Sequence, residues 1–210
     1  MSVFMQGCTF NCKNCFNKET HDFNGGKEFT DEIIDKVLEL CGKDYIVGLS
    51  ILGGEPMHPK NIDGTLKLAK KFKEKYPNKV AFSYKNTTIT YNELYEKSVE
   101  YGEKYSNILD GESNKPICIL ADRGIDVLPY MFGCLYSGNF YVLIDSALPA
   151  ARISDMVSSI SPICVVGEGN VIKILRRDNN IIYTSYDELS AVNISRIYGK
   201  HFSYGFEPMY

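Results

Sequence analysis

Residues 8–15 read Cys8-Thr9-Phe10-Asn11-Cys12-Lys13-Asn14-Cys15, a polar loop that carries three thiols at C-x3-C-x2-C spacing. Three thiolates can bind three irons of a cubane cluster and leave the fourth iron open to another ligand. A structural zinc site needs four protein ligands, and zinc sequences more often have paired C-x2-C units or nearby histidines. The spacing therefore favours an iron-sulfur site at Cys8, Cys12 and Cys15. The alternatives are a zinc or structural cluster, or three unrelated thiols.

A second feature strengthens the iron-sulfur interpretation. The short apolar run at residues 49–52 leads directly into Gly53-Gly54-Glu55-Pro56. Glycines at the end of a strand let the backbone approach a ligand closely. On its residue type alone, Glu55 is open to another interpretation, as a helix cap or a surface carboxylate.

Together the two segments resemble the radical S-adenosylmethionine enzymes. Their flanks narrow the resemblance to the family of activating enzymes of anaerobic ribonucleotide reductase, over about residues 1–79. The flanks that carry this likeness are Met5 to Gly7, Phe16 to Thr20, Asp22 to Gly26, and Gly48 to Pro59.

The resemblance implies that Cys8, Cys12 and Cys15 bind a [4Fe-4S] cluster, and that S-adenosyl-L-methionine chelates the fourth iron. It implies that Gly53, Gly54 and Glu55 receive the methionine ammonium group through backbone carbonyls. The implied activity is that of an oxidoreductase that generates a glycyl radical on the large subunit of anaerobic ribonucleoside-triphosphate reductase, with an electron donor such as a flavodoxin. No catalytic side chain is expected, because the cofactor supplies the reactivity.

Hydrophobic periodicity predicts a βα series with a parallel sheet in residues 1–79. We expect strands over 2–6 and 45–52, the second suited to a buried parallel sheet. We expect one helix capped by Thr30 and closed by Gly42, and another over 62–76. Phe16 is either a shield for the cluster or a core residue. The lysines of the second helix form a solvated face or a docking surface for an acidic partner; they are Lys67, Lys70, Lys71, Lys73 and Lys75.

The pattern changes at residue 80. Residues 80–94 predict a β-hairpin that turns at Asn86, followed by a helix with Thr90 and Glu93 as a capping box. From here the chain resembles the start of an adenylate-forming, AMP-binding domain of the peptide synthetase type, over about residues 80–210. The segments that carry this likeness are Ile117 to Arg123, Leu135 to Asp145, and Leu148 to Ile153.

Residues 117–166 also predict an α/β arrangement without the resemblance, because apolar strands alternate with helices at about 126–135 and 150–160. Gly167-Glu168-Gly169 lacks the third glycine of a dinucleotide fingerprint and the helix that should follow it, so we interpret it as a turn. Residues 176–180 predict a turn, and residues 198–210 a loop. The sequence contains no Ser/Thr/Gly-rich loop ending in lysine, the element that holds ATP phosphates in adenylate-forming enzymes. We therefore expect no adenylation by this polypeptide alone.

The predicted fold class is α/β. A partial radical-SAM βα sheet, in a truncated domain over residues 1–79, precedes a partial N-terminal α/β subdomain of an adenylate-forming enzyme over residues 80–210. Three hypotheses follow. The chain is a radical enzyme whose cluster assembles, an inactive fusion of two truncated domains, or a protein whose AMP-binding, adenylation-domain fragment is a binding module.

Composition sets outer bounds on the function. The chain has 210 residues, of which 44% are hydrophobic and 23% charged, as is ordinary for a soluble globular protein. A net charge of −3 argues against nucleic acid as the main partner. No apolar run reaches the roughly 18 residues of a membrane span, and the N-terminus does not resemble a signal peptide. We expect a cytoplasmic protein with no membrane partner.

The seven cysteines favour a reducing compartment, because their number is odd and their placement does not suggest a disulfide scaffold. Four of them lie among apolar neighbours and are expected to be buried structural thiols; they are Cys41, Cys118, Cys134 and Cys164. The histidines are scattered and are interpreted as loop or surface residues; they are His21, His58 and His201.

Overall fold

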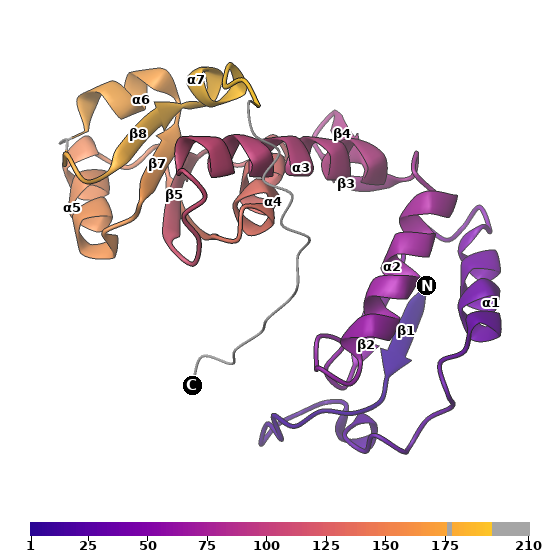
Figure 1. Cartoon of the computed structure of the whole chain (residues 1–210). Helices are drawn as coiled ribbons and strands as arrows, with labels where there is room; N and C mark the ends of the chain where they lie inside the picture. Colours follow the sequence, from indigo (N-terminus) through magenta and orange to yellow (C-terminus); the bar gives the residue numbers. More distant parts are fainter. Residues whose placement is uncertain (176–177, 195–210) are drawn as a thin grey trace. The chain divides into compact units, whose positions relative to one another are not determined.

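A computed structural model describes residues 1–175 and 178–194 (Figure 1). The chain forms two compact units, Met1–Asn92 and Glu93–Tyr210. The backbone N–H groups of Tyr91 and Asn92 donate to the carbonyls of Lys79 and Pro77, so this segment folds back within the first unit. The division predicted at residues 79 and 80 remains a prediction.

The first unit contains a parallel pair of strands, β1 (Ser2–Met5) and β2 (Ser50–Gly53). Their register runs from Ser2 opposite Ser50 to Met5 opposite Gly53. The prediction of a strand over 45–52 was wrong in its first part, because residues 45–49 are not in a strand. The pairing is limited by β1, which offers only four residues.

Two helices cover one face of this pair: α1 (Asp31–Cys41) and α2 (Ile62–Lys75) (Figure 1). The side chain of Thr30 accepts a hydrogen bond from the Ile33 N–H at 3.4 Å, as expected of an N-cap, and Gly42 follows the last turn. The core between the helices and the strands is apolar. Its fully buried members include Ile34, Leu38, Cys41, Leu68 and Phe72.

The opposite face of the β1–β2 pair is exposed. Val3 and Ile51 pack against the helical core, whereas the alternate residues Phe4 and Leu52 are 54% and 43% exposed. The prediction of a buried parallel strand was therefore wrong, because helices cover only one face.

The expected lysine face of α2 is partly engaged with α1. The Lys67 ammonium lies 2.8 Å from the Asp31 carboxylate, and Lys71 lies 3.0 Å from Asp31 and 3.3 Å from Asp35. These pairs lower the pKa of Asp31 and raise that of Lys71, chiefly through their hydrogen bonds. Lys67 and Lys71 thus pair with α1 while remaining partly solvated.

A hairpin ends the first unit, as predicted. Strands β3 (Val80–Tyr84) and β4 (Thr87–Thr90) are antiparallel, and the turn between them is Lys85-Asn86. Helix α3 (Tyr91–Ile108) begins directly after Thr90. Lys85 has a positive φ of 52°, the left-handed backbone conformation that a tight hairpin turn requires.

The second unit is built on a four-stranded sheet with the strand order β6-β5-β7-β8. Its strands are β5 (Pro116–Ala121), β6 (Phe140–Asp145), β7 (Cys164–Gly167) and β8 (Ile182–Ser185). All three pairings are parallel. The predicted α/β class with parallel sheets is confirmed.

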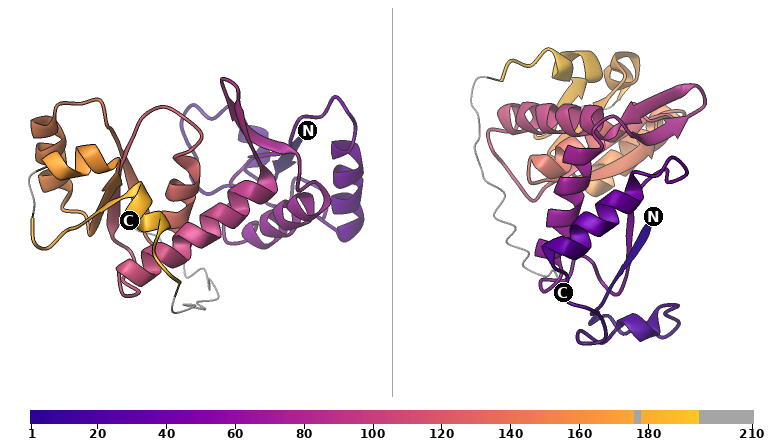
Figure 2. Two further views of the ribbon diagram at one scale, coloured as in Figure 1. Left: turned by 90° about the horizontal axis from the view of Figure 1, so that it is seen from above. Right: turned by 90° about the vertical axis from the view of Figure 1, so that its right-hand side faces the viewer.

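Helices cover both faces of this sheet (Figure 2). Ile117 and Ile119 of β5 pack with α3, α4 (Leu128–Tyr136) and α7 (Tyr186–Ser190). Cys118 and Leu120, which alternate with them, pack with α5 (Ala150–Ile160) and α6 (Gly169–Ile174). The unit therefore has two apolar cores, one on each face.

Residues 167–169 differ from their prediction. A helix of six residues, α6, begins at Gly169, so the statement that no helix follows was wrong. Sequence patterns missed it because it is short and the side chain of its N-cap, Glu168, makes no capping hydrogen bond. Residues 176–177 and the predicted loop at 198–210 lie outside the described residues.

The four cysteines predicted to be buried are each 0% exposed; they are Cys41, Cys118, Cys134 and Cys164. Burial raises the pKa of the Cys118 and Cys134 thiols to about 12. It also raises the pKa of Cys41 and Cys164. Among the helices of the described segments, none is long and apolar enough to cross a membrane.

Candidate metal centre

The cysteine loop follows β1 and presents free thiols. Cys8 and Cys15 are half-buried, and Cys12 is exposed. The Cys15 N–H donates to the Cys12 carbonyl at 3.2 Å, and Asn11 has a positive φ of 46°. Asparagine tolerates this left-handed conformation better than most residues, so a tight turn fits the C-x3-C-x2-C spacing.

Backbone hydrogen bonds close the loop at its base. The Gly7 N–H donates to the Thr20 carbonyl at 2.8 Å, and the Cys8 N–H donates to the His21 carbonyl at 3.2 Å. A short 3-10 helix, η1 (Lys18–Thr20), precedes the second anchor. All three cysteines thus lie on a segment whose two ends are held together.

The Gly-Gly-Glu strand end is bonded to the start of this loop. The Gly54 N–H donates to the Met5 carbonyl at 2.9 Å, and the Glu55 N–H donates to the Gly7 carbonyl at 2.8 Å. The two segments that the sequence singled out are therefore adjacent.

Only glycine fits at residues 53 and 54. Gly53 has a φ of +100°, and a Cβ there would lie 2.5 Å from the Met5 carbonyl oxygen. A Cβ on Gly54 would overlap the Gly7 carbonyl and lie 2.9 Å from the Thr20 carbonyl oxygen. Close backbone approach explains both glycines.

Asn61 joins the two segments from a third place in the chain. Its side-chain amide donates to the carbonyls of Glu55, Gln6 and Gly7 at 2.9, 3.0 and 3.3 Å. Asn61 is the N-cap residue of α2, but its side chain makes no cap hydrogen bond to the helix. The sequence analysis missed it, because an asparagine before a helix is ordinarily a cap.

The Glu55 carboxylate turns back on its own loop. Its Oε1 accepts a hydrogen bond from the Met57 N–H at 2.8 Å. Met57 lies in a turn and α2 begins only at Ile62, so this contact is not the helix cap of the alternative interpretation. The Glu55 backbone, in contrast, is bonded to Gly7 and Asn61 and belongs to the centre.

Two side chains of the loop differ from what the sequence suggested. Phe16 is 98% exposed, so its interpretation as a core residue was wrong, while its role as a shield remains a prediction. His21 is more than a surface histidine, because its Nε2 lies 3.3 Å from the Cys15 sulfur.

The other two histidines lie outside the cysteine loop. His58 packs its ring on Phe23 and accepts from the Lys60 N–H through Nδ1. His201 lies outside the described residues.

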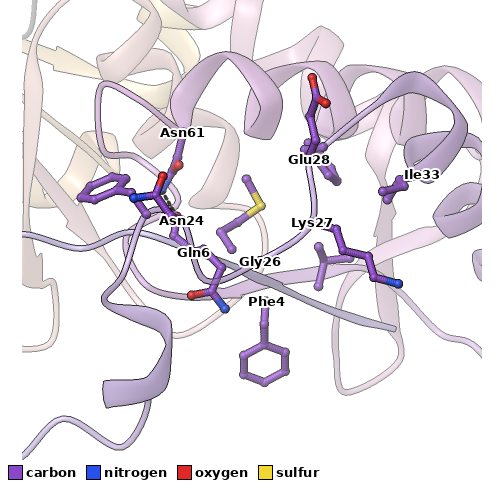
Figure 3. Close-up of a pocket in the computed structure, with 12 residues that line it drawn as sticks. Phe4, Gln6, Asn24, Gly26, Lys27, Glu28, Ile33 and Asn61 are labelled. Carbon is purple, nitrogen blue, oxygen red and sulfur yellow. Dashed lines mark hydrogen bonds between the residues drawn. The ribbon is translucent and has the colours of Figure 1, made fainter.

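A cavity of about 600 Å³ opens beside β1 (Figure 3). Its lining includes Phe4, Gln6, Asn24 and Asn61, drawn from β1, the loop before α1 and the start of α2. The Gln6 Oε1 atom is buried and accepts no hydrogen bond within the described part of the chain. Cavities of a few hundred Å³ commonly hold small ligands, and a buried acceptor without a donor is costly.

The donor set has the ligand chemistry of an iron-sulfur cluster. Within residues 1–175 and 178–194, no group of three or more His, Cys, Asp or Glu side chains is gathered so that it could hold a metal ion. In a cubane each thiolate binds its own iron, so the ligands need not surround one point. Three free thiols on one anchored loop provide the ligand chemistry that a cubane requires.

Two family descriptions match the chain. Residues 1–116 match the family described as a 4Fe-4S single cluster domain, and residues 69–197 match the AMP-binding enzyme family. The chain belongs to both families. Membership of the first assigns an iron-sulfur cofactor, and membership of the second confirms the resemblance of the second part to AMP-binding enzymes.

Curated proteins that are similar in sequence to this chain carry the name anaerobic ribonucleoside-triphosphate reductase-activating protein. The Vibrio cholerae relative is 33% identical over 90 residues, which are 42% of this chain and 58% of that protein. The Salmonella typhimurium relative is 29% identical over 113 residues, which are 53% of this chain and 72% of that protein. The chain thus spans little more than half the length of the Vibrio protein.

Part of this chain has the same fold as part of two solved structures. NpsA of Klebsiella oxytoca, in complex with 3-hydroxyanthranilyl-AMSN, has a TM-score of 0.52 and 16% identity, covering 60% of this chain and 25% of that one. An artificially fused adenylation-PCP di-domain of NpsA and ThdA has a TM-score of 0.50 and 18% identity, covering 57% of this chain and 23% of that one. At these identities the likeness shows the fold alone.

Proposed function

We propose that this chain is a radical S-adenosylmethionine activating protein for anaerobic ribonucleotide reductase, with its cluster site in a truncated domain over about residues 1–79. The observation that carries the proposal is the anchored cysteine loop, which is bonded to the Gly-Gly-Glu strand end through Met5 and Gly7. The names of the relatives support the reductase as partner. A small electron-transfer protein such as a flavodoxin is the proposed electron donor.

In this proposal the chain binds and orients its cofactors. Cys8, Cys12 and Cys15 bind the cluster, and the backbone carbonyls of Gly53, Gly54 and Glu55 receive the methionine ammonium group. A reduced [4Fe-4S] cluster with S-adenosylmethionine supplies, when bound, the radical that abstracts hydrogen from a glycine of the reductase. Asn61 and the His58 N–H together fix the direction of the Glu55 carbonyl, because both donate to that oxygen, at 2.9 and 3.0 Å.

Gln6 lines the cavity beside β1. The buried Gln6 Oε1 lacks a donor among the described residues, and Gln6 lies two residues before Cys8. The adenine amino group of S-adenosylmethionine would satisfy this acceptor once the Gln6 side chain turns toward the cavity. Gln6→Leu is therefore expected to weaken binding of S-adenosylmethionine without removing the cluster.

Anaerobic reconstitution of the full chain with iron and sulfide tests the proposal. We expect about four irons per chain, with an electron paramagnetic resonance spectrum of the reduced protein that changes when S-adenosylmethionine is added. Cys12→Ala is expected to remove this signal, and Cys41→Ala, which alters a buried thiol, is the matched control. Adding the large subunit of the reductase should then produce a glycyl radical signal.

The same experiment separates the proposal from an inactive fusion of two truncated domains. A chain that takes up no cluster, or holds one that is indifferent to S-adenosylmethionine, is a non-catalytic fusion. The glycyl radical signal tests the partner separately, because a competent cluster with no radical on the reductase would exclude only that substrate.

For the second part of the chain we propose a binding module without adenylation activity, in a truncated AMP-binding domain over about residues 80–210. The observation in favour is that its four-stranded sheet is packed with buried apolar side chains on both faces. Pyrophosphate exchange with ATP and a panel of carboxylic acids is expected to stay at the level of a blank. Exchange above the blank would contradict this assignment.

A further inference from the structure

His21 makes two contacts with the cysteine loop. Its backbone carbonyl accepts from the Cys8 N–H at 3.2 Å, and its imidazole Nε2 lies 3.3 Å from the Cys15 sulfur. The residue is half-buried and follows η1 as its C-cap, with its own N–H donating to the Lys18 carbonyl. One residue therefore contacts two of the three cysteines from a fixed backbone position.

The direction of the side-chain hydrogen bond follows from the chemistry of the ligand. A cysteine that binds iron is a thiolate and has no S–H to donate. The imidazole must then donate through Nε2–H, which leaves Nδ1 as the other ring nitrogen. The Asn17 N–H also points to the Cys15 sulfur at 3.4 Å, so this sulfur has two N–H donors from one short segment.

We propose that His21 is a positioning residue that donates a hydrogen bond to the Cys15 thiolate and makes the iron-sulfur cluster easier to reduce. An N–H donor draws electron density from the sulfur, and this stabilises the more negative, reduced cluster. Outer partners of this kind also hold a ligand in orientation. The inference rests on the proposed function, because it requires that the loop binds a cluster.

The test compares three variants of the full chain after anaerobic reconstitution. His21→Phe keeps a ring of similar size and removes the donor, and His21→Gln keeps an N–H donor at similar reach. His58→Phe is the matched control, because that ring packs on Phe23 and its Nδ1 accepts from Lys60. The measurement is a redox titration followed by electron paramagnetic resonance, with iron content determined for each sample.

We expect His21→Phe to have a more negative midpoint potential than the wild type. At the wild-type midpoint, its ratio of reduced to oxidised cluster should fall roughly two- to tenfold, the size of the net contribution of one ordinary hydrogen bond. His21→Gln should recover most of the shift, and His58→Phe should show none. An unchanged potential in His21→Phe with full iron content would overturn the inference.

A second measurement covers the case in which His21→Phe takes up no iron. The His58→Phe protein is prepared with ¹⁵N-labelled histidine, so that His58 contributes no signal. Its cluster is reduced, and the magnetic coupling between the ¹⁵N nuclei and the cluster is recorded. A ¹⁵N coupling that is lost in His21→Gln supports the hydrogen bond, and the absence of any coupling overturns it. If the wild type binds no cluster, the proposed function fails. If it binds a cluster whose midpoint potential is the same in His21→Phe, only the inference about His21 fails.

Discussion

Asn61 connects the two motifs of the candidate centre although it belongs to neither. Its amide group reaches three carbonyls that lie 6, 54 and 55 residues away in the chain. Two N–H groups shared among three acceptors form a branched arrangement that a methyl group or a carboxylate cannot replace. Asn61 therefore holds together two backbone segments that are distant in the sequence, at residues 6–7 and at residue 55.

We expect Asn61→Ala and Asn61→Asp to weaken cluster binding by about 10- to 100-fold, the range found when an outer support of a metal site is lost. Asp keeps the shape but cannot donate, so it should be no better than Ala. The measurement is iron retention against a chelator. Asn180→Ala, an exposed residue of the second unit, is the control. Wild-type retention in Asn61→Asp would show that the amide donors are dispensable.

The seven cysteines fall into two classes of reactivity. Those of the loop are free and at least partly accessible, whereas the other four are fully buried and their pKa values are raised. In the cluster-free native chain at pH 8, we expect three thiols to react rapidly with a disulfide reagent and four only after unfolding. Replacing Cys8, Cys12 and Cys15 by Ala should abolish the rapid phase. A rapid phase of four or more would contradict the burial.

At the level of elements, α3 and α4 pack through two glycines. A Cβ on Gly102 would lie 2.6 Å from the Tyr136 Cβ, and a Cβ on Gly133 would lie 2.7 Å from the Tyr101 Cβ. The two helix backbones therefore approach more closely than side chains would permit. This contact forms part of the core on one face of the second sheet.

Gly133→Val should lower the free energy of unfolding by about 1–3 kcal/mol, because the added atoms overpack a close helix contact. Urea unfolding followed by circular dichroism measures the change. Gly124→Val is the control, since its Cβ would meet nothing closer than 3.9 Å. Equal stability of the two variants would mean that α3 and α4 can separate without cost.

Local patterns predicted the elements whose signals lie within themselves. Thr30 marks the start of α1, and α5 has the predicted bounds of 150 and 160. The length of β2 could not be predicted in this way, because a strand extends only as far as its partner, and β1 provides four residues. The exposure of Leu52 has a similar origin, since it depends on what covers the far face of the pair.

On the scale of the whole molecule, family resemblance predicted both parts of the chain and singled out two segments that the fold brings together. It did not predict what holds them. The contact of His21 with Cys15 depends on a loop that returns after η1, and two of the three bonds of Asn61 span more than fifty residues. Such contacts have no local sequence signal, because their partners are carbonyls and sulfurs brought near only by the fold.

The buried thiols make the fold sensitive to alkali. Desolvation raises the pKa of Cys118 to about 12, while the unfolded thiol ionises near its ordinary pKa of about 8.5. The stability contributed by the neutral thiol is complete below the unfolded pKa and is lost as pH rises toward the folded pKa. Between pH 9.5 and 10.5, Cys118 alone should cost about 1.2 kcal/mol of unfolding free energy per pH unit.

Cys118→Ala removes this ionisation and should flatten the pH slope by that amount, although the cavity lowers stability at every pH. Urea unfolding under reducing conditions at pH 8, 9, 10 and 10.5 measures both effects. Cys12→Ala, which alters an exposed thiol, should leave the slope unchanged. Parallel pH profiles for the wild type and Cys118→Ala would refute the burial of the neutral thiol.

The backbone approach at Gly53 and Gly54 has a consequence for how this sequence tolerates change. Each position lacks room for one carbon atom, since the Met5, Gly7 and Thr20 carbonyls occupy that space. A library randomised at both codons and selected for chains that hold iron should therefore return glycine at each. The packing of the backbone against itself requires glycine at both positions, whether or not a cofactor is bound.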